Sequence, residues 1–385
     1  VSNCLTKEQR LSLQMDEFMN RRYEFRYNTQ IGEVEYRERF SFQFYFHPID
    51  KRAQNSIMLD AQSEGIGVWD RDIDRYLHSN RVPIYNPLEE FLFHLPHWDG
   101  KDRIHALANR VPCKNPHWEL LFHRWFLNMV SHWRGVDKMH ANNTSPILVG
   151  RQGTHKSTFC REMIPPALRA YYTDSIDFSH KRDAELYLNR FALINIDEFD
   201  QITLPQQGFL KHILQKPVVN LRKPHGRSVL ELQRYASFIG TSNQKDLLTD
   251  PSGSRRFICI EVTGNIDTTQ PIDYEQLYAQ AMHEIHHGER YWFDSEDEQI
   301  MTENNREFEQ TPAMLQLFYQ YFKTAQTKEE GEFLTPVEIL NYLKKKSGMS
   351  LSDNKVYHFG RLLQKCGIPS KHTYKGTVYQ VIKLS

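Results

Sequence analysis

Residues 150–158, GRQGTHKST, are of the types that could hold the phosphates of a nucleotide. Phosphate-binding loops follow the pattern G-x-x-x-x-G-K-[ST], in which backbone N–H groups cradle the phosphates and the lysine reaches the outer ones. Gly150, Lys156 and Ser157 stand at this spacing, and the serine hydroxyl would bind Mg²⁺. The other candidate nucleotide-binding residues of the loop are Gly153, Thr154, His155 and Thr158.

His155 stands where the pattern has its second glycine. Glycine suits that place because it avoids crowding and adopts left-handed backbone angles without a steric cost. Histidine is among the other residue types that are enriched at positive φ. We therefore expect the loop to form. His155 should affect the catalytic rate of the site more than the fold of the loop.

Two segments further along the chain supply groups that such a site needs. The apolar run 191–196 is followed by Asp197 and Glu198. Asp197 would hold the hydrated metal, and Glu198 would orient the attacking water. A later apolar run ends at Asn243, whose amide can hold that water or the γ-phosphate.

Arg255 and Arg256 follow the turn DPSGS, and either guanidinium could reach a phosphate within the chain or across a subunit boundary. An arginine in this role stabilises the charge of the transition state. The pattern does not rank the two arginines. Together with Lys156, Glu198 and Asn243, they complete the set of candidate catalytic residues.

Four apolar runs between residues 146 and 262 would position these groups: PILVG, FALINID, YASFIGTSN and RFICIEV. They alternate with polar or helical stretches, which is typical of buried parallel strands in an α/β fold. A phosphate loop works because it leaves a buried strand and enters a helix. The segments SPILVG and KSTFCREMI supply that strand and that helix.

The order of GRQGTHKST, LINIDEFD, FIGTSN and DPSGSRRF resembles the virulence-associated protein E family, which is grouped with the superfamily-III and poxvirus-type primase-helicases of phages and mobile elements. The upstream YNPLEEFL and WDGKDRI are similar to that family's lead-in. The tail resembles a domain that follows this ATPase in Bacteroides-type proteins. The resemblance implies a P-loop NTPase core of the AAA+ or superfamily-III helicase type, with ATP and Mg²⁺ as cofactors. It also implies single-stranded or forked DNA as a partner, a homo-oligomeric ring with a hexamer favoured, and a primase domain or partner.

Three parts are expected along the chain: a mixed α/β region over 1–97, the ATPase over 98–300 and a winged-helix-like domain over 311–385. Aromatic alternation over 23–46 predicts a hairpin, which is either a core sheet or a base-stacking platform. In the tail, three helical segments precede a hairpin around Lys375-Gly376, the order of a winged helix.

Lys+Arg and Asp+Glu both number 48, so a contact with nucleic acid needs a local concentration of basic residues. Residues 211–234 hold six basic residues against one acid, in a pattern that predicts two strands around a turn. Superfamily-III helicases carry a channel-facing hairpin before the corresponding strand, and a solvated surface hairpin is the alternative. The candidate DNA-binding residues near the tip are Arg222, Lys223, His225 and Arg227.

Residues 283–287, HEIHH, match the H-E-x-x-H pattern of zinc peptidases, but no third ligand is evident. We expect these histidines on the surface of a helix. The five cysteines are scattered, as in reduced proteins of the cytoplasm. No apolar run approaches the roughly 18 residues of a membrane span.

The favoured function is an ATP-dependent DNA helicase or translocase module of a phage or mobile-element replication protein, which hydrolyses ATP at the subunit interfaces of a ring. The alternative is a DNA-binding regulatory protein that binds nucleotide as a switch with little hydrolysis. A zinc metallopeptidase is a third hypothesis. DNA-stimulated ATP turnover separates the first two, and metal analysis tests the third.

Overall fold

The computed structural model describes the chain except for the following residues: 1–4, 43, 136, 138, 222–229, 249–250, 311–312, 326–330, 349–355, 375 and 385. The chain forms two compact units, Val1–Phe308 and Glu309–Ser385. Each unit has its own hydrophobic core. Among the described residues, no helix is long and apolar enough to cross a membrane.

The first unit begins with a small antiparallel sheet and three helices. The hairpin predicted over 23–46 is confirmed in its first part, because β1 (Tyr23–Asn28) pairs antiparallel with β2 (Glu33–Glu38). The second strand ends sooner than the alternation suggests. The other elements here are α1 (Lys7–Arg22), β3 (His47–Pro48), α2 (Lys51–Ser63), α3 (Asp70–Leu77) and β4 (Ile84–Tyr85). The sheet order is β3-β2-β1-β4.

Aromatic residues of this region divide between core and surface. Tyr23 and Phe25 are buried with residues of α1, α2 and α3, so the paired part of the hairpin is a core sheet. Phe40 and Phe42 lie beyond the end of β2 and are 88% and 96% exposed. The alternating pattern therefore continues past the strand into a segment whose rings face solvent.

A five-stranded parallel sheet forms the centre of the first unit, in the order β11-β5-β10-β7-β6. Its strands are β5 (Ser145–Val149), β6 (Tyr172–Thr173), β7 (Leu193–Ile196), β10 (Ser237–Ser242) and β11 (Phe257–Glu261). The four predicted parallel strands are confirmed, and the short β6 is additional. Because β10 lies between β5 and β7, the carboxyl ends of these three strands are neighbours.

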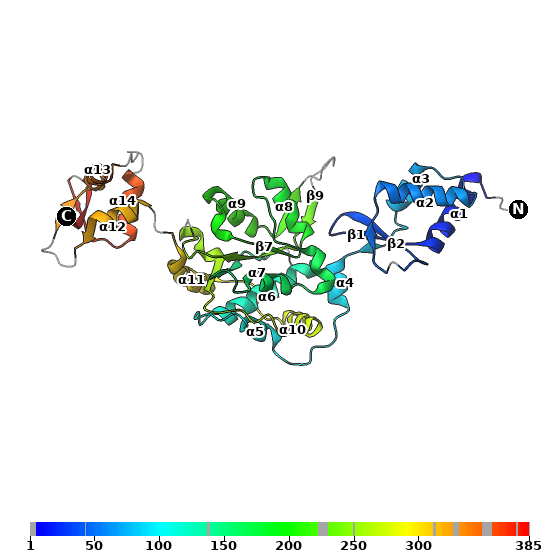
Figure 1. Ribbon diagram of the computed structural model, residues 1–385, viewed down its shortest axis with the longest axis horizontal. Helices are drawn as coiled ribbons and strands as arrows, with labels where there is room; N and C mark the ends of the chain where they lie inside the picture. Colours follow the sequence, from blue (N-terminus) through cyan, green and yellow to red (C-terminus); the bar gives the residue numbers. More distant parts are fainter. Residues whose placement is uncertain are drawn as a thin grey trace. The chain divides into compact units, whose positions relative to one another are not determined.

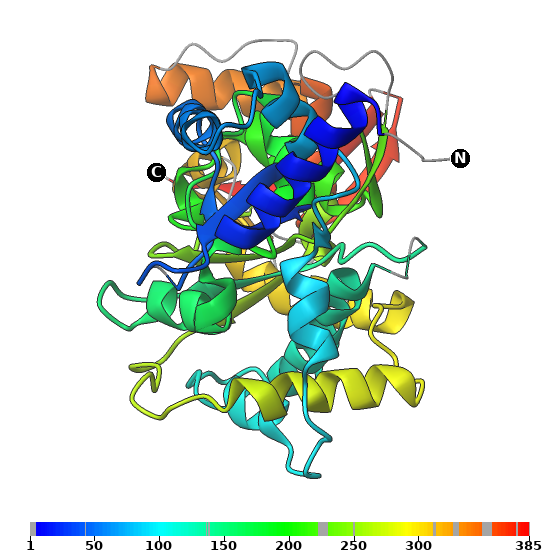
Figure 2. The ribbon, with the colours of Figure 1, turned by 90° about the vertical axis from the view of Figure 1, so that its right-hand side faces the viewer.

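Helices cover both faces of this sheet, which explains why its strands are apolar throughout. Leu148 of β5 packs into the core that includes α5 (Arg103–Ala108), α6 (Trp118–Arg134) and α10 (Tyr274–His286). Ile147 and Val149 pack into the core that includes α8 (Lys181–Arg190) and α9 (Leu204–Leu214). Figures 1 and 2 show α10 beside α5 and α6. The other helices of this part are α4 (Pro87–Phe93), α7 (Lys156–Glu162) and α11 (Ser295–Asn304). The short 3-10 helices are η1 (Pro166–Tyr171), η2 (Phe199–Gln201), η3 (Pro251–Arg256) and η4 (Asn305–Phe308).

A second hairpin lies between β7 and β10 in the chain. Its strands are β8 (Val218–Leu221) and β9 (Leu230–Gln233), which pair antiparallel with Val218 opposite Gln233. The predicted strand pair is therefore confirmed. The predicted tip, with Arg222, Lys223, His225 and Arg227, lies outside the described residues.

The second unit contains the three helices and the terminal hairpin that were predicted. Thr335 caps α13, and Gly348 ends it at φ 66°. The chain leaves α12 directly into a strand at Phe322, which places Phe322 in the core and pairs it with Lys383. The elements are α12 (Ala313–Tyr321), β12 (Phe322–Thr324), β13 (Glu332–Leu334), α13 (Pro336–Ser347), α14 (Val356–Lys365), β14 (Ser370–Thr373) and β15 (Gly376–Lys383).

Candidate functional site

The loop between β5 and α7 has a tightly defined backbone. A side chain at Gly150 would place a Cβ 3.0 Å from the Val262 carbonyl oxygen, so any residue other than glycine would press against that backbone. Gly153 has φ 82°, and His155 has φ 65° and ψ 23°. His155 thus adopts the left-handed conformation that the glycine of the motif would adopt, and it does so directly before α7.

Lys156 points back across this loop. Its ammonium donates to the carbonyl oxygens of Gly150 at 2.7 Å and Arg151 at 2.8 Å, and to Oδ1 of Asn243 at 3.2 Å. The residue is only 6% exposed. Burial lowers the pKa of Lys156, and the nearby Asp197 carboxylate opposes that shift. The cation is therefore held at the junction of the loop and the end of β10.

Asp197 joins the loop to two strand ends. Its Oδ1 accepts hydrogen bonds from Ser157 Oγ at 2.9 Å and from Thr241 Oγ1 at 2.5 Å. Thr241 was not among the predicted site residues. A signal for it exists, because Thr241 and Asn243 are two positions apart at the end of one predicted strand and so favour the same face.

Two further acids follow β7. Glu198 has φ 54°, an uncommon conformation for a residue other than glycine and one that often marks functional sites. Asp200 was also missed from the sequence. Its Oδ1 accepts from Ser242 Oγ at 2.9 Å and from the Asn243 backbone N–H at 3.4 Å, and so holds the segment that carries Asn243.

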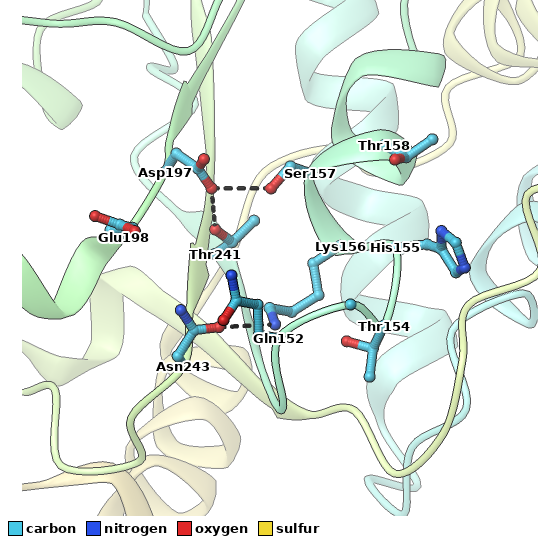
Figure 3. A pocket seen from close by; sticks show the side chains of 11 residues that line it. Gln152, Thr154, His155, Lys156, Ser157, Thr158, Asp197, Glu198, Thr241 and Asn243 are labelled. Atoms are coloured by element: carbon cyan, nitrogen blue, oxygen red, sulfur yellow. Dashed lines mark hydrogen bonds between the residues drawn. The ribbon is translucent and has the colours of Figure 1, made fainter.

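These groups surround one cavity of about 300 Å³. Figure 3 shows Asp197 beside Ser157 and Thr241, and Lys156 beside Asn243, with His155 pointing away from them. The predicted residues that line the cavity are Gly153, Thr154, His155, Lys156, Ser157, Thr158, Asp197, Glu198 and Asn243. Hydroxyl and carboxylate oxygens are ligands that Mg²⁺ prefers, so Ser157 and Asp197 fit a metal of this type.

Arg255 and Arg256 do not join this set. They precede β11, whose first residue, Phe257, pairs with Ser145 at the start of β5. The loop follows the other end of β5, so the arginines and the loop lie at opposite edges of the sheet. Arg255 instead forms an ion pair with Glu298 at 2.9 Å.

Two residues of the predicted basic segment over 211–234 have structural roles. Arg234 is 1% exposed and is fully surrounded by carbonyl oxygens. Lys216 pairs with Glu185 at 2.7 Å. These two cations are thus engaged within the protein.

The HEIHH segment lies on α10, as expected, but Glu284 faces inward. Its carboxylate bonds to His123 Nε2 at 2.6 Å and accepts from Gln280 Nε2 at 2.8 Å. His283 and His287 stack on each other with ring centroids 3.9 Å apart. Among the described residues, no group of three or more His, Cys, Asp or Glu side chains could hold a metal ion. This arrangement gives no support to a zinc site.

Comparison with protein families matches residues 92–310 to the virulence-associated protein E-like domain. The chain belongs to this family. Residues 311–381 match DUF3874, a domain of unknown function from B. theta. The predicted family and its additional C-terminal domain are therefore confirmed.

Two solved structures are similar to the chain over nearly its whole length. The apo structure of the NrS-1 C-terminal region (305–718) has 12% sequence identity and a TM-score of 0.48, with 99% of this chain and 100% of that chain covered. An A-form apo structure of the NrS-1 C-terminal region has 12% identity and a TM-score of 0.45, with 97% and 99% covered. The search of curated proteins gives no match.

Proposed function

We propose that the site binds and hydrolyses ATP with Mg²⁺, and that the chain is a DNA helicase or translocase module of a phage or mobile-element replication protein. One observation carries the proposal. Lys156, Ser157, Asp197 and Asn243 come from the ends of three neighbouring parallel strands and converge on one cavity. A cation, a metal-binding oxygen pair and a polar amide are the groups that phosphoryl transfer needs in one place.

Each residue has a separate role in this proposal. Lys156 would exchange its contacts with loop carbonyls for contacts with the β- and γ-phosphates. Ser157 and Asp197 would hold Mg²⁺, which neutralises phosphate charge when it is bound. The Ser157 hydroxyl already donates a hydrogen bond of 2.9 Å to Asp197 Oδ1, so these two oxygens lie side by side at the proposed metal site.

Glu198 is the candidate for activating water. Its side chain lines the cavity. Within the described part of the chain, this carboxylate forms no hydrogen bond or ion pair. A carboxylate in this state can accept a proton from water. Asn243 would orient that water or the γ-phosphate, and Asp200 would position Asn243 through its backbone N–H.

An arginine from another subunit would complete the site. Arg255 and Arg256 lie at the sheet edge opposite the phosphate loop, which favours a role in trans over one within the chain. This supports a homo-oligomeric ring, and the family resemblance favours a hexamer. A primase domain or partner would act with such a ring during replication.

DNA is proposed as the partner on two grounds. In the chain, the β8–β9 hairpin lies between β7, which precedes Asp197, and β10, which precedes Asn243, so its tip would be placed to sense the nucleotide state. In the second unit the helices α12, α13 and α14 precede the β14–β15 hairpin, an order that supports the proposal of a winged-helix-like DNA-binding domain.

ATP turnover with and without single-stranded DNA tests the proposal. We expect DNA-stimulated hydrolysis in the wild type and its loss in Lys156→Ala. Lys245→Ala is a matched control, because Lys245 is a half-exposed lysine paired with Glu261 outside the cavity lining. ATP binding without hydrolysis, with DNA or without it, would instead support a nucleotide-switched DNA-binding protein.

A further inference from the structure

A second cavity lies in the N-terminal part of the first unit, between α1 and α3. Its volume is about 710 Å³, within the range of pockets that bind small ligands or short polymer segments. Figure 1 shows α1 and α3 close to the β1–β2 hairpin. Side chains of both helices and of the turns at either end of α3 line this groove, which has no part in the nucleotide site.

The groove has more positive than negative side chains. Lys7, Arg71, Arg75 and Arg81 line it, against the carboxylates of Glu8 and Asp72. Lys7 and Arg71 form no ion pair within the described residues. Arg75 is 3.5 Å from Asp72, but its side chain is 77% exposed, so this pair is weak. Arg81 pairs with Asp16.

Trp69 gives the groove an exposed aromatic ring. The residue is 63% exposed, although its neighbour Val68 is fully buried. Its backbone is held in place, because the Trp69 N–H donates to Asp72 Oδ2 at 3.0 Å and Gln62 Nε2 donates to the Val68 carbonyl oxygen at 2.9 Å. The ring is thus presented from a fixed backbone beside Arg71.

The groove also has an apolar wall. Met15 of α1 is half-buried, and Tyr76 of α3 is buried with the local core. A ligand here would meet cations, one exposed indole and an apolar surface together. Acidic peptides need the cations but not the indole, and a DNA duplex offers no unstacked base to it.

We propose that this groove binds a single-stranded nucleic acid, with a base stacked on Trp69 and the phosphates near Lys7, Arg71 and Arg75. Sequence-tolerant sites for single strands combine basic grooves with aromatic rings in this way, because every base has a π-face and every nucleotide a phosphate. The inference rests on the proposed function, which supplies DNA as the partner. It adds a contact far in sequence from the predicted hairpin tip.

Binding of fluorescently labelled single-stranded DNA to the full chain, without nucleotide and over a range of salt concentrations, tests this groove. Trp69→Ala should weaken binding about 5- to 150-fold, the cost of losing one stacked base. Trp69→Phe should restore most of the affinity. Arg71→Ala and Arg75→Ala should each flatten the salt slope by roughly 0.7 or less, as expected for one phosphate contact on a single strand.

Two variants serve as matched controls. Phe93→Ala removes an aromatic ring that is 81% exposed outside the groove, and Arg52→Ala removes an exposed cation of α2. Both should bind DNA like the wild type. Thermal unfolding of every variant should match the wild type, because the Trp69 side chain is mostly exposed.

Three results would overturn the inference. Unchanged affinity in Trp69→Ala and Arg71→Ala would remove the groove from DNA binding. A loss in Arg71→Ala without one in Trp69→Ala would indicate a site for acidic polymers, and equal losses for duplex DNA would exclude single-strand recognition. ATP turnover without DNA reports separately on the proposed function, since the groove residues take no part in the nucleotide site.

Discussion

His155 adopts a backbone conformation that costs most side chains on the order of 1–3 kcal/mol. His155→Gly should relieve this cost, so we expect ATP binding to be retained and ATP turnover to be equal or higher. His155→Val should lose affinity, because β-branched residues rarely adopt positive φ. ATP titration and turnover of both variants check this. Loss of ATP binding in His155→Gly would show that the imidazole itself contributes to the site.

Glu198→Gln tests the assignment of the water-activating residue. The change keeps the shape of the side chain and removes its ability to accept a proton, so ATP binding should persist while turnover falls about 10²- to 10⁴-fold. Single-turnover hydrolysis and nucleotide affinity give the two readouts. Asp174→Asn is a suitable control, because Asp174 is an exposed acid outside the cavity lining. Normal turnover in Glu198→Gln would remove this role.

At the scale of the secondary-structure elements, Arg234 holds the base of the β8–β9 hairpin in place. Its guanidinium donates to the carbonyl oxygens of Ile213 and Leu214 at the end of α9, of Lys216, of Ala236 and of Asn142. Desolvation in this site lowers the pKa of Arg234 to about 9. One buried side chain thus connects α9, the hairpin and the segment before β5.

Arg234→Met should therefore reduce the free energy of unfolding by at least about 3 kcal/mol, since each buried acceptor without a donor costs about 1–3 kcal/mol. Denaturant unfolding measures this change. Lys216→Ala, which breaks a partly exposed pair with Glu185, should cost less than about 1 kcal/mol. Equal losses in the two variants would contradict the role given to Arg234.

His132 connects α6 to the same segment, because its Nε2 accepts from the Asn142 N–H at 2.8 Å. Burial, with a contribution from Arg234, lowers the pKa of His132 to about 3. Below pH 6.5 the unfolded chain takes up a proton that the folded chain refuses, so stability falls as the pH falls toward 3. At pH 5 this costs about 2 kcal/mol relative to pH 7. His132→Gln keeps an acceptor and should show a flatter pH dependence, and parallel pH profiles in denaturant unfolding would contradict this.

The local hydrophobic pattern of the sequence predicts the strands of the central sheet better than it predicts their order within that sheet. The apolar runs of β5, β7, β10 and β11 are each visible in the sequence, since both faces of these strands are buried. The insertion of β10 between β5 and β7 depends on long-range packing, so the contacts of Asp197 with Thr241 could not be read from spacing alone. The same limit applies to Asp297 of α11, which lies in an acidic stretch typical of a solvated helix but is 2% exposed and paired with Arg124.

At the scale of the whole molecule, the position of Arg255 and Arg256 determines whether either arginine could act on the phosphate loop of its own chain or only on that of a neighbouring subunit. The parallel pairing of β11 with β5 puts both arginines at the sheet edge away from Lys156. Five residues of β5 span about 16 Å, which is beyond the reach of an arginine side chain from that edge. Neither arginine can therefore reach the phosphate loop of its own chain, so a catalytic role for either one would require a neighbouring subunit.

Mixing of inactive subunits tests this arrangement. Arg255→Ala or Arg256→Ala subunits retain the phosphate loop, and Lys156→Ala subunits retain both arginines. In mixed oligomers some interfaces combine an intact loop with an intact arginine, so a fraction of the ATP turnover should return, with a maximum near equal proportions. Mixtures of Lys156→Ala with Glu198→Gln provide the control, because both changes affect the same side of an interface and one defective site cannot complement the other. The arginine whose variant is rescued is the catalytic one, whereas no rescue of either in oligomers of confirmed size would assign the pair a structural role such as the contact of Arg255 with Glu298.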